Sequence, residues 1–304
     1  MRTNTIHIPV LQREVVKYLD PQSNENFIDC TVGGGGHALA ILEKNEPKGK
    51  VLGIDQDPEI IKILKSKVQD SKLSKRLILV SDNFVNLKEI IKKEKFISVS
   101  GILFDLGMSS WHLAESRRGF SFLRNEPLDM RYNPQGPLMA EKIINYWSES
   151  EIEKILREYG EERFAEEIAK KIIETRRTKL VKTTLQLVNI IKEATPVWYQ
   201  KRKIHSATRT FQALRITVND EFNNLKSALP QAIDILNTGG RLTVISFQSL
   251  EDRIVKNFLK EHGNKKEKSP NLKILTKKPI KPSKEEIKIN PRSRSAKLRA
   301  VQKL

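Results

Sequence analysis

The 304-residue chain is poor in the features that mark secreted, membrane-spanning and metal-binding proteins. Its single cysteine, Cys30, excludes an intramolecular disulfide framework and favours a reducing compartment. No run of 18 apolar residues occurs, and the N-terminal stretch has no continuous apolar segment typical of a secretory signal. The five histidines and one cysteine show no metal-ligand spacing, so no metal is expected. We therefore expect a soluble protein of the cytoplasm with no membrane segment.

Acidic residues are scarce in two segments of a chain whose net charge is +18. Residues 176–215 contain ten lysines and arginines against one acid, Glu193, and residues 261–304 contain 14 against four. Basic charge gathered in this way is typical of a protein that binds a polyanion. The arginine-containing middle segment favours nucleic acid over a plain solvated face. For the lysine-rich C-terminal segment both interpretations stay open.

Four consecutive glycines at 33–36 follow a short apolar stretch at 27–30 and precede a helical pattern that begins near His37. A strand, a glycine-rich turn and a helix start together favour a nucleotide-like ligand, because free backbone N–H groups converge there. A flexible linker would carry more polar residues. The stretch GGGGHA also fits the dinucleotide fingerprint G-x-G-x-x-A, a weak signal when alone. It leaves a nicotinamide dinucleotide and S-adenosylmethionine both open.

Apolar strands alternate with helical patterns over the first hundred residues, which predicts a parallel sheet covered by helices on both faces. About a hundred residues with helical patterns then interrupt the alternation. It resumes with a short helix, the break TGG, the strand RLTVISF and two charged segments that could form a final pair of strands. We expect an α/β sheet domain at 1–109 and 218–304, with a helical substrate-recognition domain inserted at 110–217. Strands are predicted at 27–30 and at the segments KVLGID, RLILVS and GILFD. Helices are predicted over Pro58–Val68, about 85–95, Ser148–Gly160 (which begins with a capping box), about 162–176, about 184–194 and about 231–237.

Polar residues follow the predicted strands at the edge where open α/β sheets bind their ligands. Asp55 lies about twenty residues beyond the glycines, where a carboxylate can accept hydrogen bonds from ribose hydroxyls. Asp105 ends the fourth strand and begins the turn DLGMSS, which is typical of the place where amine methyltransferases hold an acidic or polar group. This turn and the basic segments favour a nucleic-acid methyltransferase over a dehydrogenase.

Eight motifs resemble, in order, those of one family. They are TVGGGGHA, GILFDLGMSS, RRGFSF, PLDMRYNP, YGEERFAEEIAKKI, ATRTFQALRI, GGRLTVISFQSLEDRIVKNF and NPRSRSAKLR. The chain is similar to the bacterial 16S ribosomal RNA cytosine-N4 methyltransferases from about His7 to Arg299. The resemblance implies a Rossmann-like class I methyltransferase sheet with an inserted all-helical domain. It also implies S-adenosylmethionine as cofactor and, as substrate, the N4 amine of a cytosine in the decoding region of the small ribosomal subunit.

The resemblance also implies a set of cofactor contacts, at Gly35, Gly36, His37, Asp55, Phe84, Asp105 and His112. We expect the two glycines to let the backbone approach the cofactor, His37 to cap the helix start, and Phe84 to stack on adenine or to belong to the core. Two positions depart from the family: His112 stands where glutamine is more frequent, and Gln248 where histidine is usual. Both can still form hydrogen bonds.

The expected chemistry is an in-line displacement governed by positioning, in which an acceptor must activate the conjugated cytosine amine. Asp105 is the predicted catalytic residue, with Ser109 and Ser110 as lesser candidates that simple turn chemistry also explains. Since a stacked base hides its amine, the target must be splayed out of its helix. The residues predicted to contact RNA are Arg117, Arg118, Arg209, Phe211 and Arg215, although Phe211 and Leu214 also suit a helix core.

Two other functions remain open from the residues alone, a nicotinamide-dependent dehydrogenase and a non-catalytic RNA-binding or assembly factor. The sequence also leaves open whether Asp105 contacts the cofactor, the base or both. It does not distinguish free 16S rRNA from the assembled subunit as substrate, or a monomer from a homodimer.

Overall fold

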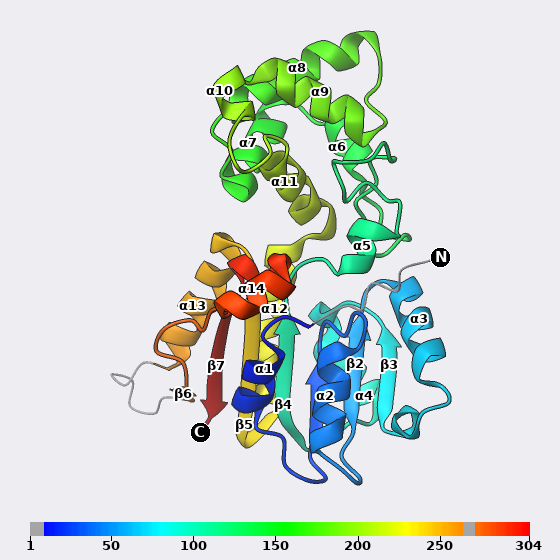
Figure 1. Cartoon of the computed structure of the whole chain (residues 1–304), viewed down its shortest axis with the longest axis vertical. Helices are drawn as coiled ribbons and strands as arrows, with labels where there is room; N and C mark the ends of the chain where they lie inside the picture. The colour runs from blue at the N-terminus through cyan, green and yellow to red at the C-terminus, as the bar shows by residue number, and fades with distance from the viewer. Residues whose placement is uncertain (1–8, 264–270) are drawn as a thin grey trace. The chain divides into compact units, whose positions relative to one another are not determined.

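The structure is a computed structural model that describes residues 9–263 and 271–304 (Figure 1). Two sequence predictions therefore fall partly outside the described residues: the start of the family resemblance at His7 and part of the basic segment 261–304. The chain divides into two compact units. The first comprises Met1–Gly107 with Phe222–Leu304, and the second comprises Met108–Glu221.

A seven-stranded sheet forms the centre of the first unit. Its strands are β1 (Asn26–Asp29), β2 (Val51–Asp55), β3 (Leu77–Ser81), β4 (Val99–Asp105), β5 (Leu236–Ser246), β6 (Leu272–Ile274) and β7 (Lys297–Lys303). The strand order is β3-β2-β1-β4-β5-β7-β6. β7 runs antiparallel to both of its neighbours, whereas the other pairs are parallel. The predicted final pair of strands is thus confirmed, and the order reverses between β1 and β4, where open sheets bind ligands.

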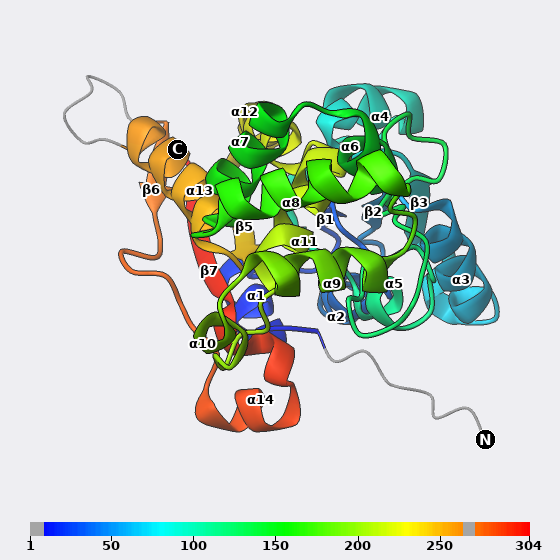
Figure 2. The same cartoon turned by 90° about the horizontal axis from the view of Figure 1, so that it is seen from above.

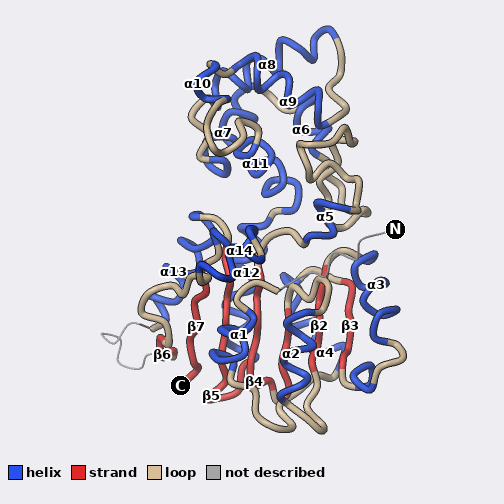
Figure 3. The backbone as a smooth tube through the Cα atoms, in the orientation of Figure 1, coloured by secondary structure: helices blue, strands red, loops and turns tan. Residues whose placement is uncertain are grey.

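Helices cover both faces of this sheet (Figure 3). One face packs against α1 (Gln12–Leu19), α2 (Gly36–Lys44) and α3 (Pro58–Val68), and the other against α4 (Leu87–Glu94), α12 (Glu221–Ile235) and α13 (Ser249–His262). Successive strand residues face opposite layers: Ile102 packs with α12, whereas Leu103 packs on the side of α2. Near-continuous apolar strands are needed because both faces are buried. Among the described residues no helix is long and apolar enough to span a membrane.

Local sequence signals explain where several helices begin. Asp57 precedes α3 and accepts a hydrogen bond from the Glu59 N–H, and Pro58 occupies the first turn, where a missing N–H costs nothing. The helix predicted over Pro58–Val68 is confirmed. The remaining short elements of the first unit are η1 (Lys72–Lys75), η2 (Phe84–Asn86), α14 (Lys284–Ile289) and η3 (Pro291–Ser295).

The second unit is helical, as predicted. It contains α5 (Ser110–Ala114), α6 (Ala140–Tyr146), α7 (Glu149–Gly160), α8 (Ala165–Thr178), α9 (Thr184–Ala194), α10 (Val197–Gln200) and α11 (Thr208–Asn219). α8 packs against both α7 and α9, and α11 packs against α7 (Figure 2). The capping box of Ser148 and Glu151 is present, and Gly160 is the last residue of α7. Apolar faces of all these longer helices meet in one buried cluster.

Some element predictions were wrong. The helix expected from residue 231 begins at Glu221, with Pro230 inside it. The helix continues through Pro230 because Leu225 and Leu229 bury an apolar face, which outweighs the hydrogen bond lost at the proline. The expected break TGG lies within β5, where Gly239 adopts φ +83° beside a register shift against β4. The helices that were not predicted are α1, α5, α6, α10, α11, α13 and α14.

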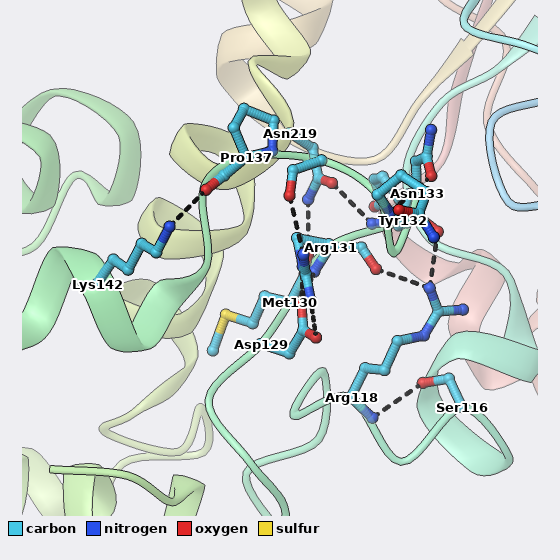
Figure 4. Close-up of polar contacts among 12 residues, drawn as sticks. Ser116, Arg118, Asp129, Met130, Arg131, Tyr132, Asn133, Pro137, Lys142 and Asn219 are labelled. Atoms are coloured by element: carbon cyan, nitrogen blue, oxygen red, sulfur yellow. Dashed lines mark hydrogen bonds and ion pairs between the residues drawn. The ribbon is translucent and has the colours of Figure 1, made fainter.

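A loop of the second unit, residues 116–137, is held together by side chains that donate to backbone carbonyls (Figure 4). Arg118 is buried, and its guanidinium donates to the carbonyls of Arg131 at 2.9 Å and Tyr132 at 2.7 Å. The Asn219 side chain donates to the Met130 carbonyl and accepts from the Tyr132 N–H, both at 2.8 Å. These contacts hold Met130 at φ +61°, a conformation that costs a non-glycine residue energy. The motif PLDMRYNP therefore has a structural role in this unit.

We expect Arg118→Ala to lower the free energy of unfolding by about 2–4 kcal/mol, because it leaves buried carbonyls without donors. Arg117→Ala is the matched control, since the neighbouring Arg117 side chain is exposed and should change stability by less than about 0.5 kcal/mol. Urea unfolding of both variants measures the difference. Equal stabilities would show that the Arg118 guanidinium does not hold the loop and would leave it available for RNA.

Candidate functional site

Three carboxylates meet at the carboxyl edge of the sheet in the first unit. Asp29, Asp55 and Asp105 are the last residues of the adjacent strands β1, β2 and β4. The glycine turn at 33–36 leads from β1 into α2 at the same edge, where Val32 bonds to the end of β2. The structure therefore brings together, around the switch point, the predicted residues Gly35, Gly36, His37, Asp55 and Asp105.

The glycine turn is required by backbone geometry as well as by close packing. Gly33 and Gly35 have φ angles of +49° and +83°, which side chains other than glycine rarely adopt. A Cβ added to Gly35 would lie 2.6 Å from a methyl carbon of Leu64, and one added to Gly36 would lie 2.2 Å from Pro9. These glycines let the turn pack closely onto its neighbours, and the turn leaves the first N–H groups of α2 at the sheet edge.

Asp55 fixes this turn through its two carboxylate oxygens. One oxygen accepts from the Gly33 N–H at 3.1 Å, and the other accepts from the Asp57 N–H at 3.0 Å. A carboxylate has about four lone-pair directions, so each of its oxygens can accept more than one hydrogen bond. Asp55 thus positions the loops on both sides of it, in addition to its predicted role toward a ribose.

His37 faces the carboxylate of Asp105 and lies near the charge of Asp29. Its Nε2 is 3.5 Å from Asp105 Oδ2, the distance of an ion pair and longer than a well-formed hydrogen bond. The prediction that His37 caps α2 is wrong, because the N-terminal cap is Gly35 and no side chain bonds the free N–H groups there. A histidine in the first turn of the helix instead points toward the carboxylates that end β1 and β4.

Asp29 is fully buried and was not among the predicted site residues. Its Oδ1 accepts from the Thr31 N–H at 3.1 Å, and the Thr31 hydroxyl oxygen accepts from the Asp105 N–H at 2.7 Å. Thr31 therefore links the ends of β1 and β4. The sequence did contain a signal, because an aspartate inside an apolar strand is costly unless it has a role.

Burial and neighbouring charge shift the pKa values of this cluster. Burial raises the pKa of Asp29 to about 6, while His37 and the Thr31 N–H act in the opposite direction and Asp105 and Asp55 add to the rise. For His37, burial lowers the pKa, but the facing Asp105 carboxylate and the nearby charges of Asp29 and Glu286 outweigh it and raise the pKa overall. Both shifts follow from burial and from the opposite charges that face each other in the cluster.

Two carboxylate oxygens at this edge of the sheet have no hydrogen-bond partner among the described residues. Among the described residues, Asp29 Oδ2 and Asp105 Oδ1 are buried and have no hydrogen-bond partner. Buried polar atoms of this kind are rare in folded proteins, and they indicate where a ligand, an ion or water binds. No group of three or more histidine, cysteine, aspartate or glutamate side chains in the described part of the chain could hold a metal ion.

Phe84 lies in η2, directly after β3. Its ring meets that of Phe104 edge-on at 5.4 Å and packs against the core, so one side of it belongs to the core while the side chain remains partly exposed. Stacking of adenine on Phe84 stays a prediction. Gln248 caps α13, and its Nε2 donates to Glu251 at 2.9 Å, which gives this departure from the family a structural role.

His112 and Ser109 lie in the second unit, at the start of α5. Ser109 caps the helix, and its hydroxyl is 3.0 Å from His112 Nδ1, which supports turn chemistry as the role of this serine. His112 is buried, with the rings of Phe120 and Tyr132 at 5.0 and 4.7 Å. Its predicted contact with the cofactor stays a prediction.

The residues predicted to bind RNA all belong to the second unit, but their surroundings differ. Arg117 is exposed, and Arg209 is partly exposed and donates to the Glu161 carbonyl. Arg215 forms a two-pronged ion pair with Glu221, at 2.8 and 2.9 Å. Phe211 is buried and meets Phe122 edge-on, which supports its core interpretation, and Leu214 is fully buried. Arg118 is buried in the loop described above.

The buried carboxylate predicts a pH dependence that Asp29→Asn should remove. Because the folded pKa of Asp29 lies above its ordinary value, ionisation of this group makes the wild type lose stability as the pH rises from about 4 to about 6. The asparagine would keep an oxygen for the Thr31 N–H, so Asp29→Asn should be more stable than wild type at pH 8, by up to about 3 kcal/mol. The gain should shrink below pH 6.

Urea unfolding at pH 4.5, 6 and 8 measures this difference, with the exposed Asp70→Asn as control. His37 acts in the same direction in the wild type, since a raised imidazole pKa gives stability that is lost as the pH rises through it. If Asp29→Asn is more stable than wild type by the same amount at all three pH values, the raised pKa of Asp29 is not the cause of the gain.

Comparison with known proteins places the sheet and its site in a family. Residues 4–304 match the model of the MraW methylase family. The ribosomal RNA small subunit methyltransferase H of Heliobacterium mobile is 46% identical over 310 residues, covering 98% of this chain and 99% of that protein. The protein of the same name from Clostridium botulinum (strain Kyoto / Type A2) is 45% identical over 309 residues, with the same coverage.

Among solved structures, an rRNA methylase from Clostridium thermocellum has a TM-score of 0.47 at 14% identity, covering 98% of this chain and 100% of its own. A methyltransferase from Streptococcus mutans in complex with SAH has a TM-score of 0.46 at 13% identity, covering 98% and 99%. The match over nearly the whole sequence, together with the Rossmann-like sheet, decides the assignment. The chain belongs to the MraW methylase family.

Proposed function

We propose that the protein is an S-adenosylmethionine-dependent methyltransferase that modifies the exocyclic N4 amine of a cytosine in the decoding region of 16S rRNA. The observation that carries this proposal is Asp105 Oδ1, a buried carboxylate oxygen without a hydrogen-bond partner among the described residues, beside a glycine turn at a sheet switch point. Family membership and the names of the relatives support the reaction and its RNA substrate.

The residues at the sheet edge fit the cofactor in shape and in charge. The glycine turn offers free N–H groups and close backbone approach, and the Asp55 carboxylate ends β2 at the same edge, as a ribose contact requires. Asp29 and Asp105 put negative charge where a positive sulfonium would be stabilised. S-adenosylmethionine supplies an electrophilic methyl group when bound. Family membership, rather than the carboxylates alone, favours S-adenosylmethionine over a nicotinamide dinucleotide.

Asp105 is suited to prepare the cytosine amine for attack. The amine lone pair is conjugated with the ring, and an acceptor that bonds to an amine hydrogen weakens that conjugation. Asp105 Oδ2 faces His37 at 3.5 Å, which orients the carboxylate, while Oδ1 remains for the amine. As the methyl group moves to the nitrogen, Asp105 can accept the proton that the amine must lose. His37 acts here as a positioning residue.

Substrate access requires an unstacked base and a surface that binds RNA phosphates. A cytosine within a helix hides its amine, so the target nucleotide must leave the stack to reach a buried carboxylate. The basic segment 176–215 of the second unit supplies positive charge for the surrounding strand. In this proposal the enzyme works in the cytoplasm on 16S rRNA within the small subunit. A homodimer is compatible with it and is tested by sedimentation of the pure protein.

Replacing Asp55 should weaken cofactor binding. Asp55→Ala removes a charge-assisted acceptor and frees the Gly33 turn, so affinity for S-adenosylmethionine should fall by about 10- to 150-fold, equivalent to about 1.5–3 kcal/mol. Calorimetric titration measures the change, with the exposed Asp70→Ala as control. Unchanged affinity in Asp55→Ala would remove this residue from the cofactor site.

Replacing Asp105 should affect the chemical step. Asp105→Asn keeps the shape and one acceptor oxygen but loses the charge, so single-turnover methyl transfer should slow by roughly 10²–10⁴-fold, the range for acid–base assistance. Cofactor affinity should change much less, because the Asp29 carboxylate keeps negative charge at the same sheet edge. If rate and affinity fall together, Asp105 serves the cofactor and the amine is activated elsewhere.

The same assay tests the reaction itself. Tritiated methyl groups should be transferred from S-adenosylmethionine to small ribosomal subunits, and nucleoside analysis should identify N4-methylcytidine. Wild-type protein that binds the subunit but transfers no methyl group would favour the non-catalytic assembly factor.

A further inference from the structure

The second unit exposes a tryptophan beside several cationic side chains. Trp198, in the short helix α10, is 52% exposed, although aromatic side chains of this size are usually mostly buried. The Arg163 guanidinium lies over its ring at 5.4 Å from the ring centre. Lys201, Arg202 and Lys203 follow α10 directly and are all exposed. We name Arg163, Trp198 and residues 201–203 the Trp198 surface.

Contacts of the neighbouring side chains Tyr199, Phe164 and Gln200 hold Trp198 in place. Tyr199 is 3% exposed, and its hydroxyl donates to both carboxylate oxygens of the buried Glu162, at 2.7 and 2.9 Å. Phe164 meets the rings of Trp198 and Tyr199 edge-on at 5.8 and 4.8 Å. The Gln200 side chain donates to the carbonyl of Thr195 at 2.8 Å. A helix of one turn needs such anchors, and they present Trp198 in a fixed orientation at low entropic cost.

Positive charge continues from the tryptophan toward α11. Arg202 lies over the Tyr199 ring at 5.4 Å from its centre. Arg209 and Arg202 both act on the Tyr199 hydroxyl, although burial and Glu162 together raise its pKa to about 12. Arg209 also donates to the Glu161 carbonyl.

Several nearby acids are buried or face other residues, and Glu161 is the exposed acid next to Arg163 in the chain. Glu162 is buried and bonds to Tyr199, so it points into the protein. Glu166 and Glu167 lie on the first turn of α8, and their charges act on Arg157 of α7, whose ion pair is with Glu153. Lys171, farther along α8, pairs with Glu193 at 3.0 Å. An exposed aromatic ring therefore stands among cations that are available to an anionic ligand.

We propose that the Trp198 surface binds an unpaired nucleotide of the RNA substrate, with the base stacked on Trp198 and the adjoining phosphates bound by Arg163 and residues 201–203. This inference rests on the proposed function, and it gives the second unit an RNA contact separate from the base that is methylated. Base–aromatic stacking beside arginine and lysine is the usual way in which proteins hold single-stranded RNA.

The charge of the surface favours RNA over a protein partner. Protein interfaces place aromatic residues and arginine at their centre, but they are depleted in lysine, whereas two lysines lie within this surface. A stacked base carries a backbone phosphate on each side, and this surface offers cations at Arg163, over the ring, and at residues 201–203, directly after α10. A ribosomal protein as the occupant is therefore an outcome of the test, and it would overturn the proposal.

The first experiment measures affinity for protein-free 16S rRNA and for small subunits. Trp198→Ala should weaken binding to both by roughly 5- to 100-fold, whereas Trp198→Phe should keep most of the stacking. Arg163→Ala should reduce the slope of log affinity against log salt by about 1. Affinity for S-adenosylmethionine, measured by calorimetry, should be unchanged in all three variants.

Tyr146→Ala is the matched control. Tyr146 is an exposed aromatic residue of the same unit, 71% exposed, and it is followed by acidic rather than basic residues at 149 and 151. Its replacement should leave RNA affinity unchanged. Equal losses in Tyr146→Ala and Trp198→Ala would mean that affinity depends on general stability of the unit and would overturn the assignment.

A second experiment reports on the ring itself. Trp111 and Trp147 are replaced by phenylalanine, so that Trp198 is the only tryptophan. Adding protein-free 16S rRNA should quench its fluorescence, with a midpoint equal to the affinity of this variant. Absence of quenching at saturating RNA would overturn the stacking contact.

The outcomes separate this proposal from the proposed function. If wild type methylates small subunits and Trp198→Ala binds rRNA as tightly as wild type, the proposed RNA contact at the Trp198 surface is wrong and the proposed enzyme function is supported. If Trp198→Ala loses affinity for small subunits but not for protein-free rRNA, the surface binds protein and the proposal fails. If wild type transfers no methyl group but Trp198→Ala still loses RNA affinity, the proposed function fails while the contact stands.

Discussion

The central constraint on the first unit is the burial of negative charge at one edge of its sheet. Asp29, Asp55 and Asp105 end adjacent strands, and like charges brought this close in a low-dielectric site repel each other. The fold offsets this repulsion with His37 and with backbone N–H groups, and it leaves one oxygen each of Asp29 and Asp105 without a partner among the described residues. A cationic cofactor would relieve the same repulsion, so the site should bind a positively charged ligand more tightly than a neutral one.

The glycine turn follows from this constraint. Asp55 accepts the Gly33 N–H, and Thr31 bonds to both Asp29 and the Asp105 N–H, so the chain between β1 and α2 must stay close to three strand ends. Only positive φ angles at Gly33 and Gly35 permit that path. The helix that follows then begins without a side-chain cap, and its free N–H groups remain for a ligand. The turn therefore serves the ligand and the packing together.

The sequence predicts most of this architecture where local signals agree with tertiary packing. The strand–glycine–helix order, the helix over Pro58–Val68 and the capping box at Ser148 were all readable, because each depends on residues near one another in the chain. The misses depend on contacts between distant residues. Helix α12 continues through Pro230 because its apolar face is buried against the sheet. His37, in α2, faces Asp105, which lies about 70 residues away in the chain at the end of β4. No local pattern contains that information.

Charge in the sequence also proved a poor guide to which arginines face solvent. The loop of the second unit uses Arg118 to hold backbone carbonyls, and Arg215 is paired with Glu221, so both guanidinium groups already bond within the protein. A buried, well-bonded arginine gains little from a phosphate, because binding would first break good hydrogen bonds. Exposure must therefore be known before charge can be assigned to RNA. By that criterion the exposed cations beside Trp198 are better placed for a polyanion than Arg118 and Arg215.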